Sequence, residues 1–155
     1  MNSTKSISAT CECGQLSIQI NSTSVLQLVC HCADCRGVSG EPFTEIAFFA
    51  STACEVNGSS KSITMKGGSG QGKTYFSCEM CGTCLYATVG LLNNAVGVVV
   101  EHLSAFKFKP LCHVWTSEKA VGTNISRAAI KFRRGPPKFM SAALLWSWKY
   151  LPDRR

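Results

Sequence analysis

Three of the ten cysteines lie within six residues, in the stretch Cys30-His31-Cys32-Ala33-Asp34-Cys35. Side chains alternate along an extended chain, so the C-x-C step points the thiols of Cys30 and Cys32 to one face. The C-x-x-C step that follows has the spacing of a metal-binding knuckle, in which a tight turn returns the third sulfur to the same point. A structural zinc takes four protein ligands, whereas a catalytic zinc keeps three and leaves one position open. The stretch therefore predicts an open zinc site, unless a fourth ligand comes from elsewhere in the chain.

Four further cysteines can form a second, closed site. Cys11 and Cys13 repeat the C-x-C step, and Cys78 and Cys81 form a C-x-x-C step that is followed by the glycine such a turn favours. Together they offer the four thiolates of a structural zinc that would tie the start of the chain to its middle. We therefore expect two zinc ions (Zn2+) per chain, one structural and one catalytic.

A disulfide framework is the other explanation for so many cysteines, and the rest of the sequence disfavours it. Disulfides at this density are typical of small secreted chains, but residues 1–10 are polar and lack the apolar stretch of a signal peptide. The 155 residues are 45% hydrophobic and 16% charged, which is enough to build the core of one domain. We expect zinc in place of disulfides, a reducing, cytoplasmic location, and no membrane span, because the apolar run 96–100 is far too short.

Short stretches of alternating or β-branched residues, separated by turn-forming residues, predict an all-β fold. The stretches that we expect to be strands are 16–20, 25–31, 43–50, 61–66, 73–77, 85–89, 95–101 and 112–115. We expect residues 1–9 to be a loose leader. No long helical periodicity occurs before residue 140, but residues 141–151 can form a short C-terminal helix with its leucines and Trp148 on one side.

The excess of positive charge lies at the C-terminal end. Residues 1–126 hold eight basic and eight acidic side chains, whereas residues 127–155 hold eight basic side chains and one acid. We therefore divide the chain into a zinc domain, 1–126, and a basic tail, 127–155, whose short amphipathic helix would dock on the same domain, lie on a membrane surface or cover a partner. The core is not basic, and the tail has no aromatic–basic interleaving before Trp146, so we expect no nucleic-acid partner. The sequence indicates no oligomeric state.

The cysteine pattern and its neighbours resemble the glutathione-dependent formaldehyde-activating enzyme family, also called the Gfa or centromere-protein-V family. The matching motifs lie between about residues 10 and 116, and they are Cys11-x-Cys13-Gly14, Cys30-His31-Cys32-x-x-Cys35-Arg36, Phe43, Phe76-x-Cys78-x-x-Cys81-Gly82-Thr83-x-Leu85 and His113-x-Trp115. The resemblance implies a β-tent fold, made of small antiparallel sheets that are held by zinc. It also implies a structural zinc on Cys11, Cys13, Cys78 and Cys81 and a catalytic zinc on Cys30, Cys32 and Cys35.

The resemblance implies a carbon–sulfur lyase reaction run in reverse, which joins formaldehyde to glutathione. We therefore expect a zinc-dependent carbon–sulfur lyase-type enzyme, similar to an S-hydroxymethylglutathione synthase, that acts on a small electrophile or its glutathione adduct. Its substrate would be a small molecule, with glutathione as a candidate co-substrate. Zinc depresses the pKa of a bound thiol, and three thiolate ligands favour holding sulfur over making hydroxide.

Two alternatives stay open. The first is a zinc lyase or dehydratase that acts directly on a larger carbonyl-bearing metabolite. The second is a non-catalytic, zinc-stabilised binding module that uses its basic tail.

Several neighbouring side chains are candidates for supporting roles. His113 could be a catalytic acid or base, a fourth ligand or a packed strand residue, and His31 could serve catalysis or be hydrogen-bonded in the core. Arg36 could bind an anionic substrate such as glutathione, and with Asp34 it could orient the third ligand; both could also be solvated surface charges. The remaining cysteines are expected to be small buried residues, namely Cys54, Cys84 and Cys112.

Residues 67–74 satisfy the phosphate-loop motif G-x-x-x-x-G-K-[ST]. That motif needs a preceding parallel strand and a following helix, whereas Tyr75-Phe76-Ser77 continues as a predicted strand into the second cysteine knuckle. We therefore expect a glycine-rich hairpin loop here and no nucleotide site.

Overall fold

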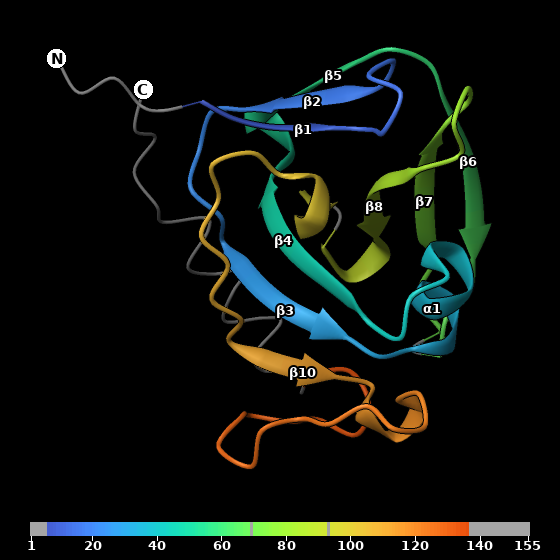
Figure 1. Cartoon of the computed structure of the whole chain (residues 1–155), viewed down its shortest axis with the longest axis vertical. Helices are drawn as coiled ribbons and strands as arrows, with labels where there is room; N and C mark the ends of the chain where they lie inside the picture. The colour runs from blue at the N-terminus through green and yellow to red at the C-terminus, as the bar shows by residue number, and fades with distance from the viewer. Residues whose placement is uncertain (1–5, 69, 93, 137–155) are drawn as a thin grey trace, which may run out of the picture.

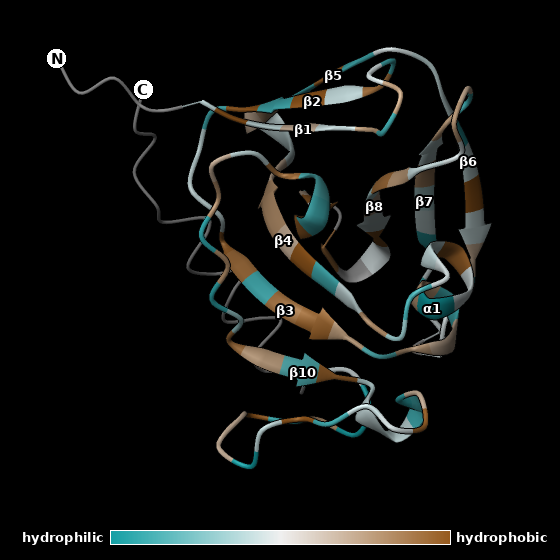
Figure 2. Cartoon of the chain, viewed as in Figure 1, coloured by the Kyte–Doolittle hydropathy of each residue, from teal (hydrophilic) through white to brown (hydrophobic). Residues whose placement is uncertain are grey.

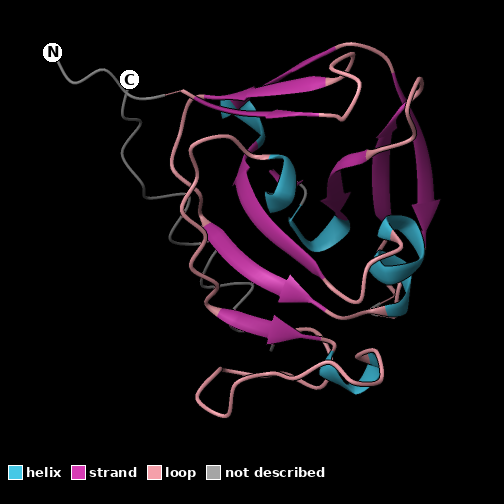
Figure 3. Ribbon diagram, in the orientation of Figure 1, coloured by secondary structure: helices cyan, strands magenta, loops and turns pink. Residues whose placement is uncertain are grey.

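The computed structural model describes residues 6–68, 70–92 and 94–136, and these form two β-sheets and one short α-helix (Figures 1 and 3). The smaller sheet has the strand order β1 (Ile7–Thr10), β2 (Ser17–Ile20), β5 (Cys54–Asn57). The larger sheet has the strand order β10 (Cys112–Val114), β3 (Leu26–Cys30), β4 (Thr44–Ala50), β9 (Ala95–Val99), β8 (Cys84–Val89), β7 (Lys73–Cys78), β6 (Ser60–Met65). Neighbouring strands are antiparallel apart from the parallel pair β10–β3. The expected all-β class is confirmed, with one sheet that is larger and mixed.

The eight strands expected from the sequence are all present, with ends within two residues of the expected ones. The prediction of a loose leader is wrong for residues 7–9, because Ile7 and Ala9 alternate with polar residues and pair with β2 as strand β1. Strand β5 was not expected, because it lies at an edge and is mostly exposed. The C-terminal helix expected at 141–151 lies outside the described residues.

The α-helix α1 (Ala33–Ser39) was also not expected, because seven residues are too few to show a helical period. Its boundaries come from local chemistry. The Cys32 sulfur accepts a hydrogen bond from the Cys35 N–H at the N-cap, and Gly40 closes the C-terminus in the left-handed conformation with φ 74°. Three short 3-10 helices follow strands β4, β9 and β10, in that order: η1 (Ser51–Ala53), η3 (Val100–His102) and η4 (Thr116–Glu118). A fourth, η2 (Gly90–Leu92), follows β8.

Strand β4 divides the hydrophobic core into two halves. Because side chains alternate along a strand, Ala47 and Phe49 pack with the apolar side of the smaller sheet, whereas Phe48 packs with residues of β3 and β10. Apolar residues run along both β3 and β4 in Figure 2. Each half of the core carries one cysteine group at its margin, with Cys11 and Cys78 in the first half and the cysteines at 30–35 in the second.

Residues 130–134 run beside β10. The His113 N–H donates to the Ile130 carbonyl at 2.8 Å, and the Phe132 N–H donates to the His113 carbonyl at 2.9 Å. The Trp115 N–H donates to the Arg134 carbonyl at 3.0 Å. The division of the chain at residue 126 stays a prediction. No helix within the described residues has the length and apolar character needed to cross a membrane.

Candidate metal centres and the adjoining pocket

Four cysteines come together from two loops to form the group that we call the closed group. Cys11 and Cys13 lie in the turn between β1 and β2, and Cys78 and Cys81 lie at and just beyond the end of β7. Their four sulfur atoms all lie within 4.8 Å of one another. The Cys13 sulfur is 3.6 Å from the sulfurs of both Cys11 and Cys78.

Each of the two loops depends on a glycine in the left-handed conformation. Gly14, with φ 80°, donates its N–H to the Cys11 carbonyl at 3.0 Å, and Gly82, with φ 75°, donates to the Cys78 carbonyl at 2.9 Å. A side chain at either position would be strained by the backbone. The glycine that ends each C-x-C-G and C-x-x-C-G segment is therefore a condition for bringing the sulfurs together.

Three cysteines from consecutive elements form the open group. Cys30 ends β3, Cys32 caps α1, and Cys35 lies in the first turn of that helix. Their sulfurs lie within 4.8 Å of one another, and those of Cys30 and Cys32 are 3.4 Å apart. All three residues are buried, with at most 6% of their surface exposed. No histidine or carboxylate of the described chain joins them at that distance, so the group offers three ligand atoms.

The spacing of both groups fits zinc. A tetrahedron with zinc–sulfur bonds of about 2.3 Å has edges of about 3.8 Å, which is close to the sulfur separations of 3.6 Å in the closed group and 3.4 Å in the open group. The ten cysteines all lie in the described part of the chain, and none forms a disulfide.

The protonation of the open group also fits a bound cation. Hydrogen bonds from Cys30 and Cys35 lower the pKa of Cys32 to about 2, while the hydrogen bond with Cys32 raises the pKa of Cys30 well above its usual value. A thiolate at Cys32 would therefore be stabilised by hydrogen bonds from its two neighbours. A soft divalent cation would allow all three thiols to ionise together.

Strand β7 places two polar side chains against the open group. Lys73 and Tyr75 are two residues apart and so lie on one face of the strand. The Tyr75 hydroxyl is 3.3 Å from the Cys35 sulfur, and the Lys73 ammonium donates to the Cys32 sulfur at 3.4 Å. Lys73 is buried, and its Nζ is also 3.6 Å from Asp34 Oδ2, which is the one ion pair of the described residues. The lysine therefore compensates part of the negative charge of the open group.

The same lysine accounts for the sequence that resembles a phosphate loop. Residues 66–72 join the antiparallel strands β6 and β7, so the expected hairpin loop is confirmed. Gly68 lies against the indole of Trp115, where a Cβ would come within 2.7 Å of the ring. Lys73 Nζ is 6.0 Å from the centroid of that ring. Gly68 thus packs on Trp115, and the lysine of the motif, Lys73 in β7, is directed at a cysteine.

The two candidate histidines, His31 and His113, are hydrogen-bonded to one another. His31 Nε2 and His113 Nδ1 are 2.9 Å apart, and their rings stack with centroids 5.2 Å apart. Burial lowers the pKa of both imidazoles, which favours a pair of neutral rings. His31 is almost fully buried, and neither ring lines the pocket described below. The catalytic role of His113 stays a prediction.

The remaining candidate residues are Arg36 and three further cysteines, and within the described part of the chain none of them is hydrogen-bonded to a sulfur atom of the open group. Arg36 donates from Nε to the His31 carbonyl at 3.4 Å and does not line the pocket, so its role in binding glutathione stays a prediction. Cys112 is buried as expected, whereas Cys54 and Cys84 are half-buried. Cys84 lines the pocket.

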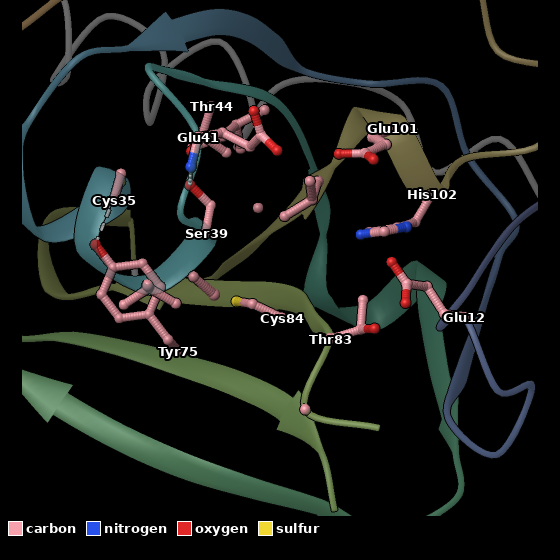
Figure 4. A pocket seen from close by; sticks show the side chains of 16 residues that line it. Glu12, Cys35, Ser39, Glu41, Thr44, Tyr75, Thr83, Cys84, Glu101 and His102 are labelled. Carbon is pink, nitrogen blue, oxygen red and sulfur yellow. Dashed lines mark hydrogen bonds between the residues drawn. The ribbon is translucent and has the colours of Figure 1, made fainter. Parts of the chain in front are cut away.

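A pocket of about 170 Å³ adjoins the open group (Figure 4). Cys35 and Tyr75 line one end of it, while Glu12, Glu101 and His102 gather at the other. Its walls come from α1, the start of β4, β8 and β9. Because Glu12 stands between Cys11 and Cys13 in the chain, the pocket extends from the open group to the loops of the closed group.

Sequence reasoning missed Lys73, Tyr75 and the acidic lining of this pocket. Lys73 and Tyr75 were seen as part of a strand, but the cysteines that they contact lie about forty residues earlier in the chain, at separations of 41 and 40. The alternation K-x-Y just before a cysteine knuckle is the only local signal, and it does not say which face of the strand meets the site.

The comparisons with known proteins agree with this architecture. The family model of the glutathione-dependent formaldehyde-activating enzyme matches residues 6–118. A crystal structure of a Rhodobacter sphaeroides protein, a structural genomics target, has a similar fold, with a TM-score of 0.51 and 19% sequence identity over 64% of this chain and 90% of that chain. No curated protein matches the chain.

Proposed function

The chain belongs to the glutathione-dependent formaldehyde-activating enzyme family, and from this premise we propose that it is a zinc-dependent carbon–sulfur lyase-type enzyme that acts on a small electrophile and a thiol. One observation carries the proposal, namely that three buried cysteines converge beside a pocket and no other described residue offers them a fourth ligand. A closed, purely structural site would use four ligands. The pocket of about 170 Å³ favours a small electrophile over a larger carbonyl-bearing metabolite.

The proposal assigns a zinc ion to each cysteine group. Cys11, Cys13, Cys78 and Cys81 would hold a structural ion, and Cys30, Cys32 and Cys35 would hold a catalytic one. The catalytic ion would supply the positive charge that keeps a substrate thiol ionised at neutral pH. Ten unpaired thiols support a reducing compartment such as the cytoplasm.

The chemistry is the addition of a thiol to an aldehyde. A bond forms between the thiol sulfur and the aldehyde carbon, the carbonyl electron pair moves to the oxygen, and this oxygen takes up the proton that the thiol lost. The pocket brings the two reactants together, which is the main source of acceleration for such an addition. The Tyr75 hydroxyl orients Cys35, and the Lys73 ammonium offsets the charge of Cys32.

The experiment is magnetisation-exchange NMR on ¹³C-formaldehyde and a thiol, with and without the zinc-loaded protein. We expect the wild type to accelerate exchange between free formaldehyde and the S-hydroxymethyl adduct, and Cys32→Ser to lose that acceleration. Cys54→Ser is the matched control, because Cys54 is a half-buried cysteine outside both groups. Inertness of the wild type toward every thiol tested, or full activity of Cys32→Ser, would overturn the proposal.

A further inference from the structure

Acidic side chains and one histidine, His102, line the pocket beside the open group. Its charged lining consists of three carboxylates, those of Glu12, Glu41 and Glu101, and neither lysine nor arginine contributes. Among the described residues the one ion pair is that of Lys73 with Asp34, so no lysine or arginine of this part of the chain pairs with any of the three carboxylates. Their negative charge is therefore available to a ligand.

The fold brings the three carboxylates together from separate segments. Glu12 is placed by the turn that carries Cys11 and Cys13, Glu41 follows α1, and Glu101 lies in η3. Figure 4 shows Glu12, His102 and Glu101 at the end of the pocket away from Cys35, with the His102 ring between the two glutamates. A ligand whose thiol reaches the open group would thus extend its other end toward these acids.

A buried hydroxyl on the same lining also lacks a partner. Thr44, the first residue of β4, is only 8% exposed, and its Oγ1 makes no hydrogen bond to the described chain. Buried hydroxyls are normally paired, so an unpaired one calls for an explanation. Thr44 lines the pocket on the side of Glu41, and because its Oγ1 has less than 1 Å² of accessible surface, the ammonium or hydroxyl group of a ligand would supply the missing partner only after the side chain rotates toward the pocket.

Glutathione fits this lining poorly. It carries two carboxylates and one ammonium group, and with its thiol at the open group it would bring those carboxylates toward Glu12 and Glu101. The nearby cations do not line the pocket, since Lys73 contacts Cys32 and Asp34 and Arg36 donates one N–H to the His31 carbonyl. An aminothiol, which carries an ammonium group and no carboxylate, would meet attraction in place of repulsion.

We infer that the pocket selects a thiol whose non-reacting end is cationic, an aminothiol, over glutathione. This inference rests on the proposed function, because it takes the thiol to react at the open group. The carboxylates of Glu12, Glu41 and Glu101 are the residues that determine specificity, and Thr44 adds a hydrogen-bonding site.

The test measures binding apart from turnover. The probes are the thioethers S-methylcysteamine, which is cationic, and S-methylglutathione, which has a net negative charge, titrated into the zinc-loaded full chain and followed by calorimetry. The wild type should bind the cationic probe more tightly, and that affinity should fall with added salt. The variant Glu12→Gln/Glu41→Gln/Glu101→Gln should lose about ten-fold in affinity for it and gain affinity for S-methylglutathione.

The control variant makes the same change in net charge outside the pocket. Glu45→Gln/Glu55→Gln/Glu79→Gln removes three acids that do not line it, and Glu79 lies between Cys78 and Cys81 as Glu12 lies between Cys11 and Cys13. Both affinities should stay within about two-fold of the wild type. Tighter binding of S-methylglutathione by the wild type, or equal effects of the two triple variants, would overturn the inference.

Turnover then separates the inference from the proposed function. Turnover with glutathione preferred over cysteamine would uphold the proposed function and overturn the inference. Turnover with cysteamine preferred would support both. If no thiol adduct is turned over at all, the proposed function fails, whichever probe binds.

Discussion

Replacement of Lys73 by methionine should weaken zinc binding at the open group. The ammonium lies 3.4 Å from the Cys32 sulfur, and both residues are buried. At that separation a pair of unit charges attract by about 5 kcal/mol with an effective dielectric constant of about 20. Most of this attraction is also present without zinc, because the pKa of Cys32 is lowered in the zinc-free group as well, and a bound zinc ion would itself repel the ammonium. The part that depends on zinc is the hydrogen bond that orients the Cys32 sulfur as a ligand. We expect zinc affinity at the open group to fall by about 10- to 100-fold, as for other partners of metal ligands.

The assay is competition for zinc with a chromophoric chelator. The closed group is an internal reference, since Lys73 contacts none of its cysteines. Lys61→Met is the matched control, because Lys61 is an exposed lysine on the neighbouring strand β6. Lys73→Arg keeps the charge and should retain most of the affinity.

Two results would refute this reasoning. One is an unchanged zinc affinity in Lys73→Met, within about two-fold of the wild type. The other is an equal loss in Lys73→Met and Lys61→Met, which would show that net charge matters and the contact with Cys32 does not.

Three further predictions concern stability. Cys81→Ser removes a ligand of the closed group and should lower the midpoint of thermal unfolding by about 10 °C, measured by scanning calorimetry on zinc-loaded protein, because structural zinc contributes directly to folding; an unchanged midpoint would exclude a structural ion there. Gly58→Ala should cost about 2–4 kcal/mol in urea unfolding, since φ is 101° and a Cβ would overlap the Gln15 carbonyl oxygen. Gly122→Ala, at φ 85° with open space around it, should cost only about 1 kcal/mol, and equal losses would contradict the steric argument. Tyr75→Phe removes the 3.3 Å contact of the hydroxyl with the Cys35 sulfur and should lower the free energy of urea unfolding by about 1 kcal/mol. A more stable variant would show that this contact does not stabilise the fold.

The sequence predicts the open group well because its geometry is local, whereas the closed group joins residues as far apart as Cys13 and Cys78, 65 positions, and is predicted from the four ligands that a structural zinc needs. Alternation along a strand and a turn of two intervening residues bring Cys30, Cys32 and Cys35 together without reference to the rest of the fold. Most strands are predicted for the same reason, because their patterns lie within six or seven residues. The short helix α1 is not predicted, because its boundaries depend on one capping sulfur and one glycine.

The surroundings of the open group could not be predicted, because they are made by contacts between distant segments. The contact of Lys73 with Cys32 requires knowing that β7 turns that face toward the site. The acidic pocket requires the register of three separate segments that carry Glu12, Glu41 and Glu101. The parallel pairing of β10 with β3 brings His113 beside His31 across 82 residues, and neither residue's neighbours in the sequence indicate it.

The zinc content of the full chain tests the division into a closed and an open group most directly. Elemental analysis of protein purified under reducing conditions should find about two zinc ions per chain in the wild type and in Cys54→Ser, and about one in Cys32→Ser. One zinc ion or fewer in the wild type, or an unchanged content in Cys32→Ser, would contradict the account.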